Sequence, residues 1–196
     1  MARKIEFDQE LTLKKSMELF WEKGYENTSM QDLVDTLQIN RFSIYNSFGD
    51  KKSLFQKSLA FYRAHVFDKM NAPLHNSQRS AKQRLDDYLV VFGKNIDKKV
   101  GGLGCLVQST SLSEIAKDKD INSDLTDIFS DLTSALDSAF LDAKKEGDLR
   151  TESDPQVCAQ HLLCSLQGLI VLRKSLNDPL LASRQIAFIR QNLAYW

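Results

Sequence analysis

Apolar residues recur at intervals of three and four along nearly the whole chain, and this spacing restricts its fold more than any other feature. Residues three and four apart share one face of an α-helix, whereas a half-buried strand alternates at every second residue. The 196 residues include only three prolines and eight glycines, so few helices are interrupted. The sequence therefore predicts an all-α protein, with one large domain or two small ones that share a core.

The segment from residue 29 to residue 52, SMQDLVDTLQINRFSIYNSFGDKK, has the pattern of two short helices joined by a tight turn. Leu33, Val34 and Leu37 fall on one face of the first helix, and a break follows at residues 38–40. The second helix, at about residues 41–47, carries small polar residues and ends before Gly49. This pattern is typical of a helix-turn-helix, which places its second helix in the major groove of DNA.

The charge distribution favours DNA contact only weakly. The formal net charge is zero, but residues 1–84 carry 14 Lys and Arg against 10 Asp and Glu, and residues 85–196 carry 12 against 16. The N-terminal half can therefore approach a polyanion more easily than the C-terminal half. Any DNA binding must depend on a few placed contacts and on dimerisation, not on a large basic surface.

Cysteine usage and hydropathy indicate a cytoplasmic protein. Cys105, Cys158 and Cys164 are too few and too irregularly spaced for a disulfide framework, so we expect reduced thiols. The chain has no run of eighteen uninterrupted apolar residues and no apolar segment of signal-peptide type after its start. We therefore expect no membrane span and no secretion.

No catalytic or cofactor motif is recognisable, so we expect neither an enzyme nor a cofactor. His65, His75 and His161 belong to no Ser-His-Asp grouping. The glycine-rich residues 101–104 follow no predicted strand and lack the lysine and hydroxyl of a phosphate-binding loop.

Two clusters that could hold a metal have simpler interpretations. Cys158, His161 and Cys164 share one helix but do not converge as a tetrahedral set, so we expect them in the core or at a dimer contact. A row of aspartates is expected on an outer helix face in water: Asp124, Asp127 and Asp131. We therefore predict no metal site.

The C-terminal part contains a helical segment, residues 157–175, that is apolar nearly all round. Such a helix must be buried on most sides, and in a chain of this size we expect burial against a second copy. The residues expected at this dimer interface come from residues 157–175 and the long helix before it: Leu136, Phe140, Leu162, Leu163, Leu166, Leu169 and Ile170.

The run ELFWEKGYENTSMQDLVDTLQINRFSIYNSFGDKKSLF resembles the N-terminal domain of TetR-type transcriptional regulators. The resemblance covers about 50 residues, from Leu11 to Phe61. It includes a characteristic ending: Tyr45, Phe48, Gly49, Lys51, Leu54 and Phe55. Two later segments, GCLVQSTSLSEIA and SLQGLIVLRKS, are similar to one subgroup of these regulators.

The resemblance implies a three-helix DNA-binding domain with the helix-turn-helix at residues 1–52, and a larger helical ligand-binding and dimerisation domain at residues 53–196. It implies a homodimeric repressor that a small molecule releases from palindromic, double-stranded operator DNA. The DNA contacts that it implies are Thr28, Ser29, Arg41, Ser43, Tyr45, Asn46 and Lys51. Phe42 departs from the small residue that is common there, and could either contact a thymine methyl group or pack inward.

The helices that would wall a ligand cavity carry aromatic residues with a few polar groups, which suits an apolar or aromatic small molecule. The candidate ligand-binding residues are Phe61, Tyr62, His65, Phe92, Ile96, Cys105, Gln108, Ser109, Phe129 and Leu132.

Two alternative functions stay open. Cys105 begins a predicted helix, where a lowered thiol pKa could make it a sensor of electrophiles or oxidants, as in some regulators of the similar subgroup. A small buried residue is the simpler interpretation of Cys105. The other alternative is a helical dimerisation protein that does not bind DNA.

Overall fold

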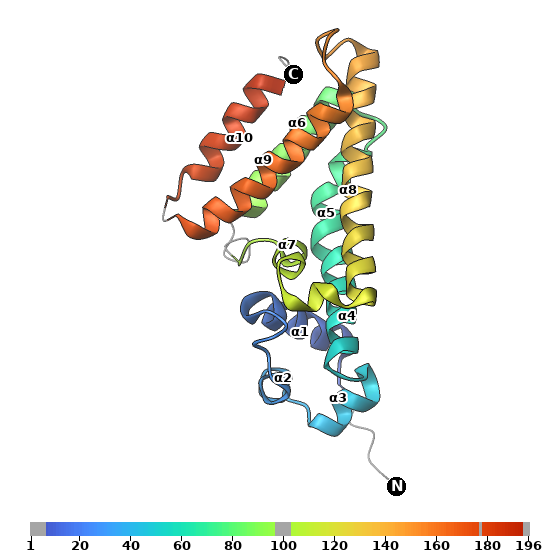
Figure 1. Cartoon of the computed structure of the whole chain (residues 1–196), viewed down its shortest axis with the longest axis vertical. Helices are drawn as coiled ribbons and strands as arrows, with labels where there is room; N and C mark the ends of the chain where they lie inside the picture. Colours follow the sequence, from blue (N-terminus) through green and yellow to red (C-terminus); the bar gives the residue numbers. More distant parts are fainter. Residues whose placement is uncertain (1–6, 97–102, 177, 194–196) are drawn as a thin grey trace.

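The computed structural model describes residues 7–96, 103–176 and 178–193. Every regular element in these ranges is helical, so the all-α prediction is confirmed. Figure 1 shows an elongated molecule with a small helical head at one end and a larger helical body above it. Gly101 and Gly102, from the glycine-rich segment, lie outside the described residues.

The head consists of α1 (Gln9–Lys23), α2 (Met30–Leu37) and α3 (Arg41–Phe48). Asp8 caps α1 and Asn40 caps α3, each by accepting hydrogen bonds from backbone N–H groups of the first turn. Such caps satisfy donors that the helix itself leaves unpaired. The positions of α2 and α3 confirm the helix-turn-helix.

Helix α4 (Lys51–Tyr62) completes the core of the head. The rings of Phe20 and Phe55 meet edge to face with their centroids 5.0 Å apart. The buried hydroxyl groups of Ser16 and Ser58 lie 2.8 Å apart, so α1 and α4 approach closely. Helix α4 also continues into the body. The predicted domain division at residue 52 falls in the first turn of this helix, and it stays a prediction.

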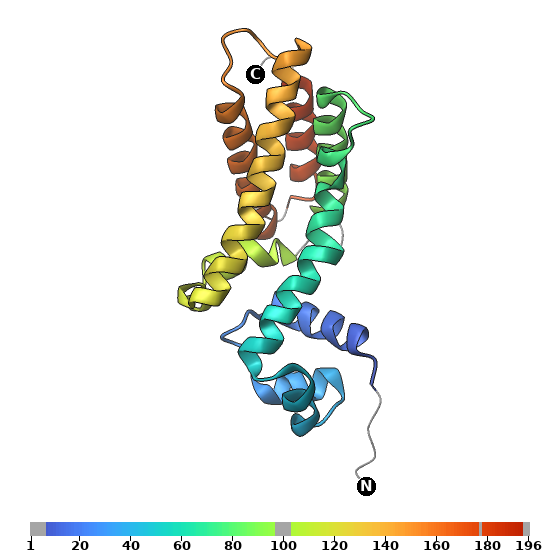
Figure 2. The same ribbon diagram turned by 90° about the vertical axis from the view of Figure 1, so that its right-hand side faces the viewer.

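A continuous helical rod leads from the head into the body (Figure 2). After α4 it passes through a π-helical turn, η1 (Arg63–Phe67), then α5 (Asp68–Asn71) and the 3₁₀ turn η2 (Ala72–His75). A π-helical turn inside an α-helix is rare and occurs frequently at functional sites.

The body surrounds the upper part of this rod. Its elements are α6 (Ala81–Ile96), α7 (Leu106–Ser111), η4 (Glu114–Lys117), α8 (Lys119–Glu146), α9 (Pro155–Ser175) and α10 (Leu181–Asn192). Helix α8 runs beside the rod, α9 packs against α8, and α10 lies on the outside against α6 and α9 (Figure 1).

Polar contacts join the head to the body. The ammonium group of Lys52 lies 3.0 Å from Asp118 and 2.9 Å from Asp120, at the start of α8. These two carboxylates raise the pKa of Lys52. The carboxylate of Glu26 accepts a hydrogen bond from the backbone N–H of Ile115 at 2.9 Å. The start of α8 and the segment before it therefore contact the head directly.

The aspartates of α8 lie partly as expected. Asp127 and Asp131 are exposed, and Asp131 forms an ion pair with Arg63. Asp124 is only half-buried rather than fully in water, and it accepts a hydrogen bond from Gln56 at 3.3 Å. Asp124 and Asp131 therefore connect α8 to the rod.

Candidate nucleic-acid interface and small-molecule cavity

Helix α3 presents one face to solvent and holds the other in the core of the head. Ile44 and Phe48 are buried, whereas Arg41, Tyr45 and Asn46 are exposed. Residues three and four apart share a helix face, so the buried pair fixes the rotation of α3 and directs the exposed side chains outward. The side chain of Ser43, also expected on this surface, is half-buried.

Phe42 is 74% exposed at the start of α3, so its side chain does not pack inward. An aromatic residue that is so exposed gains nothing from the core of the head. Its position beside Arg41 places an apolar group on the same surface as the polar ones. Of the two interpretations that the sequence left open, the structure rules out inward packing.

Arg41 and Tyr45 contact one another on the exposed face. The Arg41 Nη2 atom lies 3.4 Å from the Tyr45 hydroxyl oxygen, and the guanidinium carbon lies 5.7 Å from the centre of the ring. A cation over an aromatic face is weakly attracted to it. The contact limits the orientations that these two side chains adopt before any ligand binds.

The backbone on both sides of α3 is tightly constrained. Gln38 has a φ of 58° at the turn, and Ile39 after it is buried. At the far end, Gly49 has a φ of 89°, and a Cβ atom there would lie 2.9 Å from the Cβ of Ser53. A side chain at position 49 would therefore be strained by its backbone and would collide with α4.

Ser29 caps α2 in a reciprocal arrangement with Asp32. The Asp32 N–H donates to the Ser29 hydroxyl at 3.0 Å, and the Ser29 N–H donates to the Asp32 carboxylate at 2.8 Å. Lys23, 2.6 Å away, and Ser29 hold the pKa of Asp32 well below its usual range. This is the capping box that the sequence pattern allows.

Thr28 corrects one expected contact. Its side chain is fully buried, and its hydroxyl donates to the backbone carbonyl of Gly24 at 2.7 Å. It therefore closes the loop between α1 and α2 and is not presented to a phosphate group. Ser29, the next residue, is exposed.

Lys51 lies beside the start of α2. Its ammonium group lies 4.2 Å from the centre of the Tyr25 ring, and the residue is half-buried. Burial lowers the pKa of Lys51, while the nearby carboxylates of Glu26 and Asp32 act in the opposite direction. Lys51 therefore adds one positioned cation to a surface that is not strongly basic.

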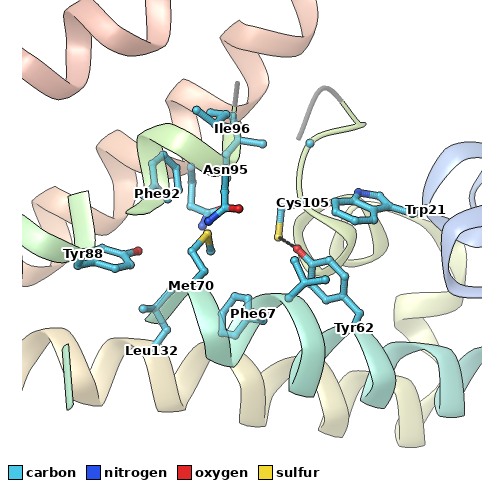
Figure 3. A pocket seen from close by; sticks show the side chains of 14 residues that line it. Trp21, Tyr62, Phe67, Met70, Tyr88, Phe92, Asn95, Ile96, Cys105 and Leu132 are labelled. Carbon is cyan, nitrogen blue, oxygen red and sulfur yellow. Dashed lines mark hydrogen bonds between the residues drawn. The ribbon is translucent and has the colours of Figure 1, made fainter. Parts of the chain in front are cut away.

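A cavity of about 90 Å³ lies where the body meets the head (Figure 3). Side chains from the rod, from α6, α8 and α9, from the residues before α7 and from α1 surround it. The lining residues are Trp21, Tyr62, Val66, Phe67, Met70, Tyr88, Phe92, Asn95, Ile96, Gly104, Cys105, Leu132, Gln167 and Ile170.

Half of the expected ligand-binding residues line this cavity: Tyr62, Phe92, Ile96, Cys105 and Leu132. The expectation is wrong for Phe61 and His65, whose rings stack 3.9 Å apart, with His65 exposed. Phe61 is adjacent to Tyr62 and points in a different direction from the helix, and His65, four positions after Phe61, lies beside Phe61.

The other three expected residues also lie elsewhere. Gln108 donates from its side chain to the backbone carbonyl of Gln167 at 3.1 Å, and Ser109 is exposed. Phe129 lines a separate groove formed by α8 with Ser111 and Ala116. Phe129 and Leu132, although three positions apart, do not reach the same cavity.

Sequence reasoning also missed residues of the cavity. Tyr88 and Asn95 lie four positions before and three positions after Phe92, so helical spacing from Phe92 could have identified them. Trp21 belongs to α1 of the head, and nothing in its sequence context indicates a contact with the body.

The cavity is uncharged. No Asp, Glu, Lys, Arg or His among the described residues lines it. The Tyr62 hydroxyl donates to the Cys105 Sγ atom at 3.6 Å, and burial raises the pKa of Tyr62, Tyr88 and Cys105. All three groups are therefore protonated at neutral pH.

This environment corrects the idea of a reactive Cys105. Cys105 is the residue before the first turn of α7, as expected, but it is 6% exposed and its pKa is raised, not lowered. A buried, protonated thiol is a poor nucleophile. A thiol-based sensor is therefore not favoured.

The expected dimer-interface residues are also corrected. Six of the seven are buried within the single chain, and Leu163 is half-buried: Leu136, Phe140, Leu162, Leu166, Leu169, Ile170 and Leu163. Leu136 and Phe140 belong to α8, and the other five belong to α9, which packs against α8. The sequence does not predict which face of α9 packs against α8, because both faces of this helix are apolar.

The opposite face of the last two helices carries exposed apolar side chains. We call this the α9–α10 surface and define it by four residues with 46–62% exposure: Val157, Val171, Leu172 and Phe188. A groove between the two helices runs through it, and Gly168 and Leu172 line this groove. Contiguous apolar patches on a protein surface mark interaction sites.

Among the described residues, α9 is the one helix long and apolar enough to span a membrane by length and composition. One such helix is weak evidence, because core helices of soluble proteins also meet these criteria. In this structure, Leu162 and Leu166 on one face of α9 are buried in the core of the body.

Three comparisons place the chain among known proteins. Residues 13–57 match the family model described as bacterial regulatory proteins, tetR family. The uncharacterized HTH-type transcriptional regulator YezE of Bacillus subtilis is 30% identical over 187 residues, which cover 91% of this chain and 92% of YezE. The HTH-type transcriptional repressor ComR of Escherichia coli is 27% identical, over 84% of this chain and 79% of ComR.

A solved structure has the same fold. It is a cysteine mutant of the TetR family transcriptional regulator CifR, complexed with 26 bp double-strand operator DNA. It covers 100% of both chains with a TM-score of 0.84 and 24% identity. Together with the helix-turn-helix of the head, these similarities show that the chain belongs to the TetR family of bacterial transcriptional regulators.

Proposed function

We propose that the protein is a homodimeric repressor that binds double-stranded operator DNA through α3 and is released when a small uncharged molecule occupies the cavity. The observation that carries the proposal is the exposed face of α3, where Arg41, Phe42, Tyr45 and Asn46 extend from a buried support. The proposal agrees with the names of relatives, since ComR is a repressor and CifR was solved on operator DNA.

The proposed DNA interface divides its contacts between bases and phosphates. Arg41 and Phe42, at the start of α3, would reach base edges in the major groove, where arginine pairs with guanine and an apolar group meets a thymine methyl. Tyr45, Asn46 and Lys51 would contact phosphates and fix the register of the head. Ser29 stays a proposed phosphate contact, although its hydroxyl already pairs with Asp32.

The proposed dimer uses the α9–α10 surface. Exposed Val171, Leu172 and Phe188 would meet their counterparts across a two-fold axis, as a self-complementary interface requires. Gly168 lies in the groove, and a Cβ atom added there would meet no other atom within 4 Å, so a second helix has space to approach. The dimer would place two copies of α3 about 34–36 Å apart, in successive major grooves.

The proposed release depends on the rod. Tyr62, Val66 and Phe67 line the cavity from the same continuous helix whose first turns belong to the head. A ligand that fits the cavity better in one orientation of the head would favour that orientation and change the separation of the two α3 helices. Such coupling typically amounts to about 1–3 kcal/mol.

The test is a selection of DNA sites from random duplexes, followed by affinity measurements over a range of salt concentrations. We expect enrichment of an inverted repeat and an affinity that falls steeply with salt. Lys51→Ala should weaken binding and reduce the salt slope by about one. Lys82→Ala, at an exposed position on α6, is the control and should change neither.

Failure to enrich any site would contradict the proposal and would favour a helical dimerisation protein that does not bind DNA. An equal salt slope for Lys51→Ala and Lys82→Ala would remove Lys51 from the interface.

A further inference from the structure

Trp21 connects the head to the cavity. It is the one residue of α1–α3 that lines the cavity, and it is 6% exposed. Its ring meets that of Tyr62 edge to face, with centroids 4.9 Å apart, and Figure 3 shows it at one end of the cavity near Cys105. A ligand in the cavity would therefore contact the head directly, and not only through the rod.

The indole N–H of Trp21 is buried and has no hydrogen-bond partner among the described residues. The side-chain carbonyl oxygen of Gln167 on α9 is likewise buried and unpaired. Gln108 does not satisfy it, because the Gln108 side chain donates to the backbone carbonyl of Gln167 instead. Two residues that line the cavity thus each carry a buried polar atom, one donor and one acceptor, without a partner among the described residues.

Unpaired buried polar atoms are unusual in folded proteins, because each loses its hydrogen bonds to water. Here both belong to residues that line the same cavity. A ligand in the cavity could supply the hydrogen-bond partners that these two buried polar atoms lack. Trp21 requires an acceptor, and Gln167 requires a donor.

Charge and size restrict the ligand further. None of the described lining residues is Asp, Glu, Lys, Arg or His, so a charged ligand would be buried without a counter-charge. The cavity of about 90 Å³ is smaller than the roughly 150 Å³ cavity that accommodates benzene. In proportion to the six non-hydrogen atoms of benzene, it holds about three or four before it must widen.

We propose that the cavity binds a small uncharged molecule with a hydrogen-bond acceptor and a donor, as in a primary amide or an alcohol, and that Trp21 donates to its acceptor while Gln167 accepts from its donor. This inference rests on the proposed effector role of the cavity. It adds that the effector bridges the head and the body through Trp21.

The test uses three probes of equal size and different chemistry: propionamide, butanone and propionate. Propionamide accepts and donates, butanone only accepts, and propionate is charged. The chain contains two tryptophans, Trp21 and Trp196, so Trp196→Phe leaves one indole N–H signal in a proton–nitrogen NMR spectrum. We expect propionamide to shift this signal saturably, butanone to bind more weakly, and propionate not to bind.

Two variants assign the contacts. Trp21→Phe keeps an aromatic ring but removes the donor, and should weaken propionamide about three- to tenfold, as measured by calorimetry. Gln167→Met keeps the length of the side chain but removes the acceptor, and should abolish the preference for propionamide over butanone. Thermal unfolding of each variant shows whether it is folded.

Equal binding of propionate and propionamide would overturn the inference, as would an indole N–H signal that propionamide does not shift. The NMR readout remains decisive if Trp21→Phe does not fold. Operator binding in the absence of probes is measured separately. A protein that binds its operator but not propionamide contradicts this inference alone, whereas one that enriches no DNA site contradicts the proposed function.

Discussion

At the scale of single residues, exposure separates side chains that the sequence pattern treats alike. Thr28 and Phe42 both lie in the segment that resembles the family. Thr28 was expected at the DNA, and Phe42 was expected either at the DNA or packed inward. The structure buries Thr28 completely and leaves Phe42 74% exposed. The difference arises from the packing of α1, α2 and α3, which a local motif does not specify.

Phe42→Ala should lower the affinity for an operator in which Phe42 contacts a thymine methyl group. Removing a methyl contact costs about 0.8 kcal/mol, which is roughly a fourfold change in affinity. Replacing that thymine with uracil should therefore weaken the wild-type protein but not Phe42→Ala. Fluorescence anisotropy with the two duplexes measures both effects. If uracil weakens both proteins equally, Phe42 does not read the methyl group.

Thr28→Val should destabilise the head without changing the DNA contacts. The variant keeps the shape of the side chain but removes the hydroxyl that donates to Gly24, at a cost of about 1 kcal/mol. Urea unfolding measures the loss, and Thr28→Ser, which keeps the hydroxyl, is the control. A large loss of operator affinity for folded Thr28→Val would show that Thr28 contacts DNA after all.

At the scale of elements, the capping box at the start of α2 gives a pH dependence. The pKa of Asp32 is lowered in the folded state by Lys23 and Ser29. Its carboxylate therefore stabilises the fold above the unfolded-state pKa of about 3.9, and this contribution is lost as the pH falls through the folded-state pKa.

The free energy of unfolding of the wild type should fall as the pH drops below about 4, and in Asp32→Asn it should fall less steeply. Asp35→Asn, which changes an exposed residue of α2 outside the capping box, is the control. Denaturant unfolding at several pH values measures the slopes. Equal slopes in wild type and Asp32→Asn would contradict the role of Asp32.

The two faces of α9 give a second prediction at this scale. Phe188→Glu or Leu172→Glu would place charge on the α9–α10 surface and should convert dimers to monomers in sedimentation experiments. Leu112→Glu is the matched control, because Leu112 is 82% exposed but lies beyond α7, away from this surface. Unchanged dimers in Phe188→Glu would place the interface elsewhere.

The sequence predicted elements better than it predicted their rotation. Caps and breakers such as Asp8, Ser29 and Gly49 define helix ends from local chemistry, so the helix-turn-helix was correct. Helix α9 was located correctly, but its interface residues were wrong, because an apolar helix gives no signal about which face meets α8. Local patterns likewise did not predict the π-helical turn at residues 63–67.

At the scale of the whole molecule, several contacts join the head and the body. The rod is continuous, Lys52 and Glu26 make polar contacts with the start of α8 and the segment before it, and Trp21 reaches the cavity. Five of the fourteen cavity residues were expected from the sequence, and four of these five lie on helices that wall the cavity. Trp21 was not, because its contact joins positions far apart in the sequence.

The central claim is that two copies of α3 read one operator at a fixed separation. The most direct measurement is the affinity and stoichiometry of the protein on the selected inverted repeat, before and after insertion of about five base pairs at its centre. Such an insertion turns the half-sites to opposite faces of the duplex. We expect a bound complex with paired protomers on the original site and an affinity at least about a hundredfold lower after insertion, a level close to non-specific binding. An affinity that is unchanged by the insertion would contradict a dimer with fixed spacing.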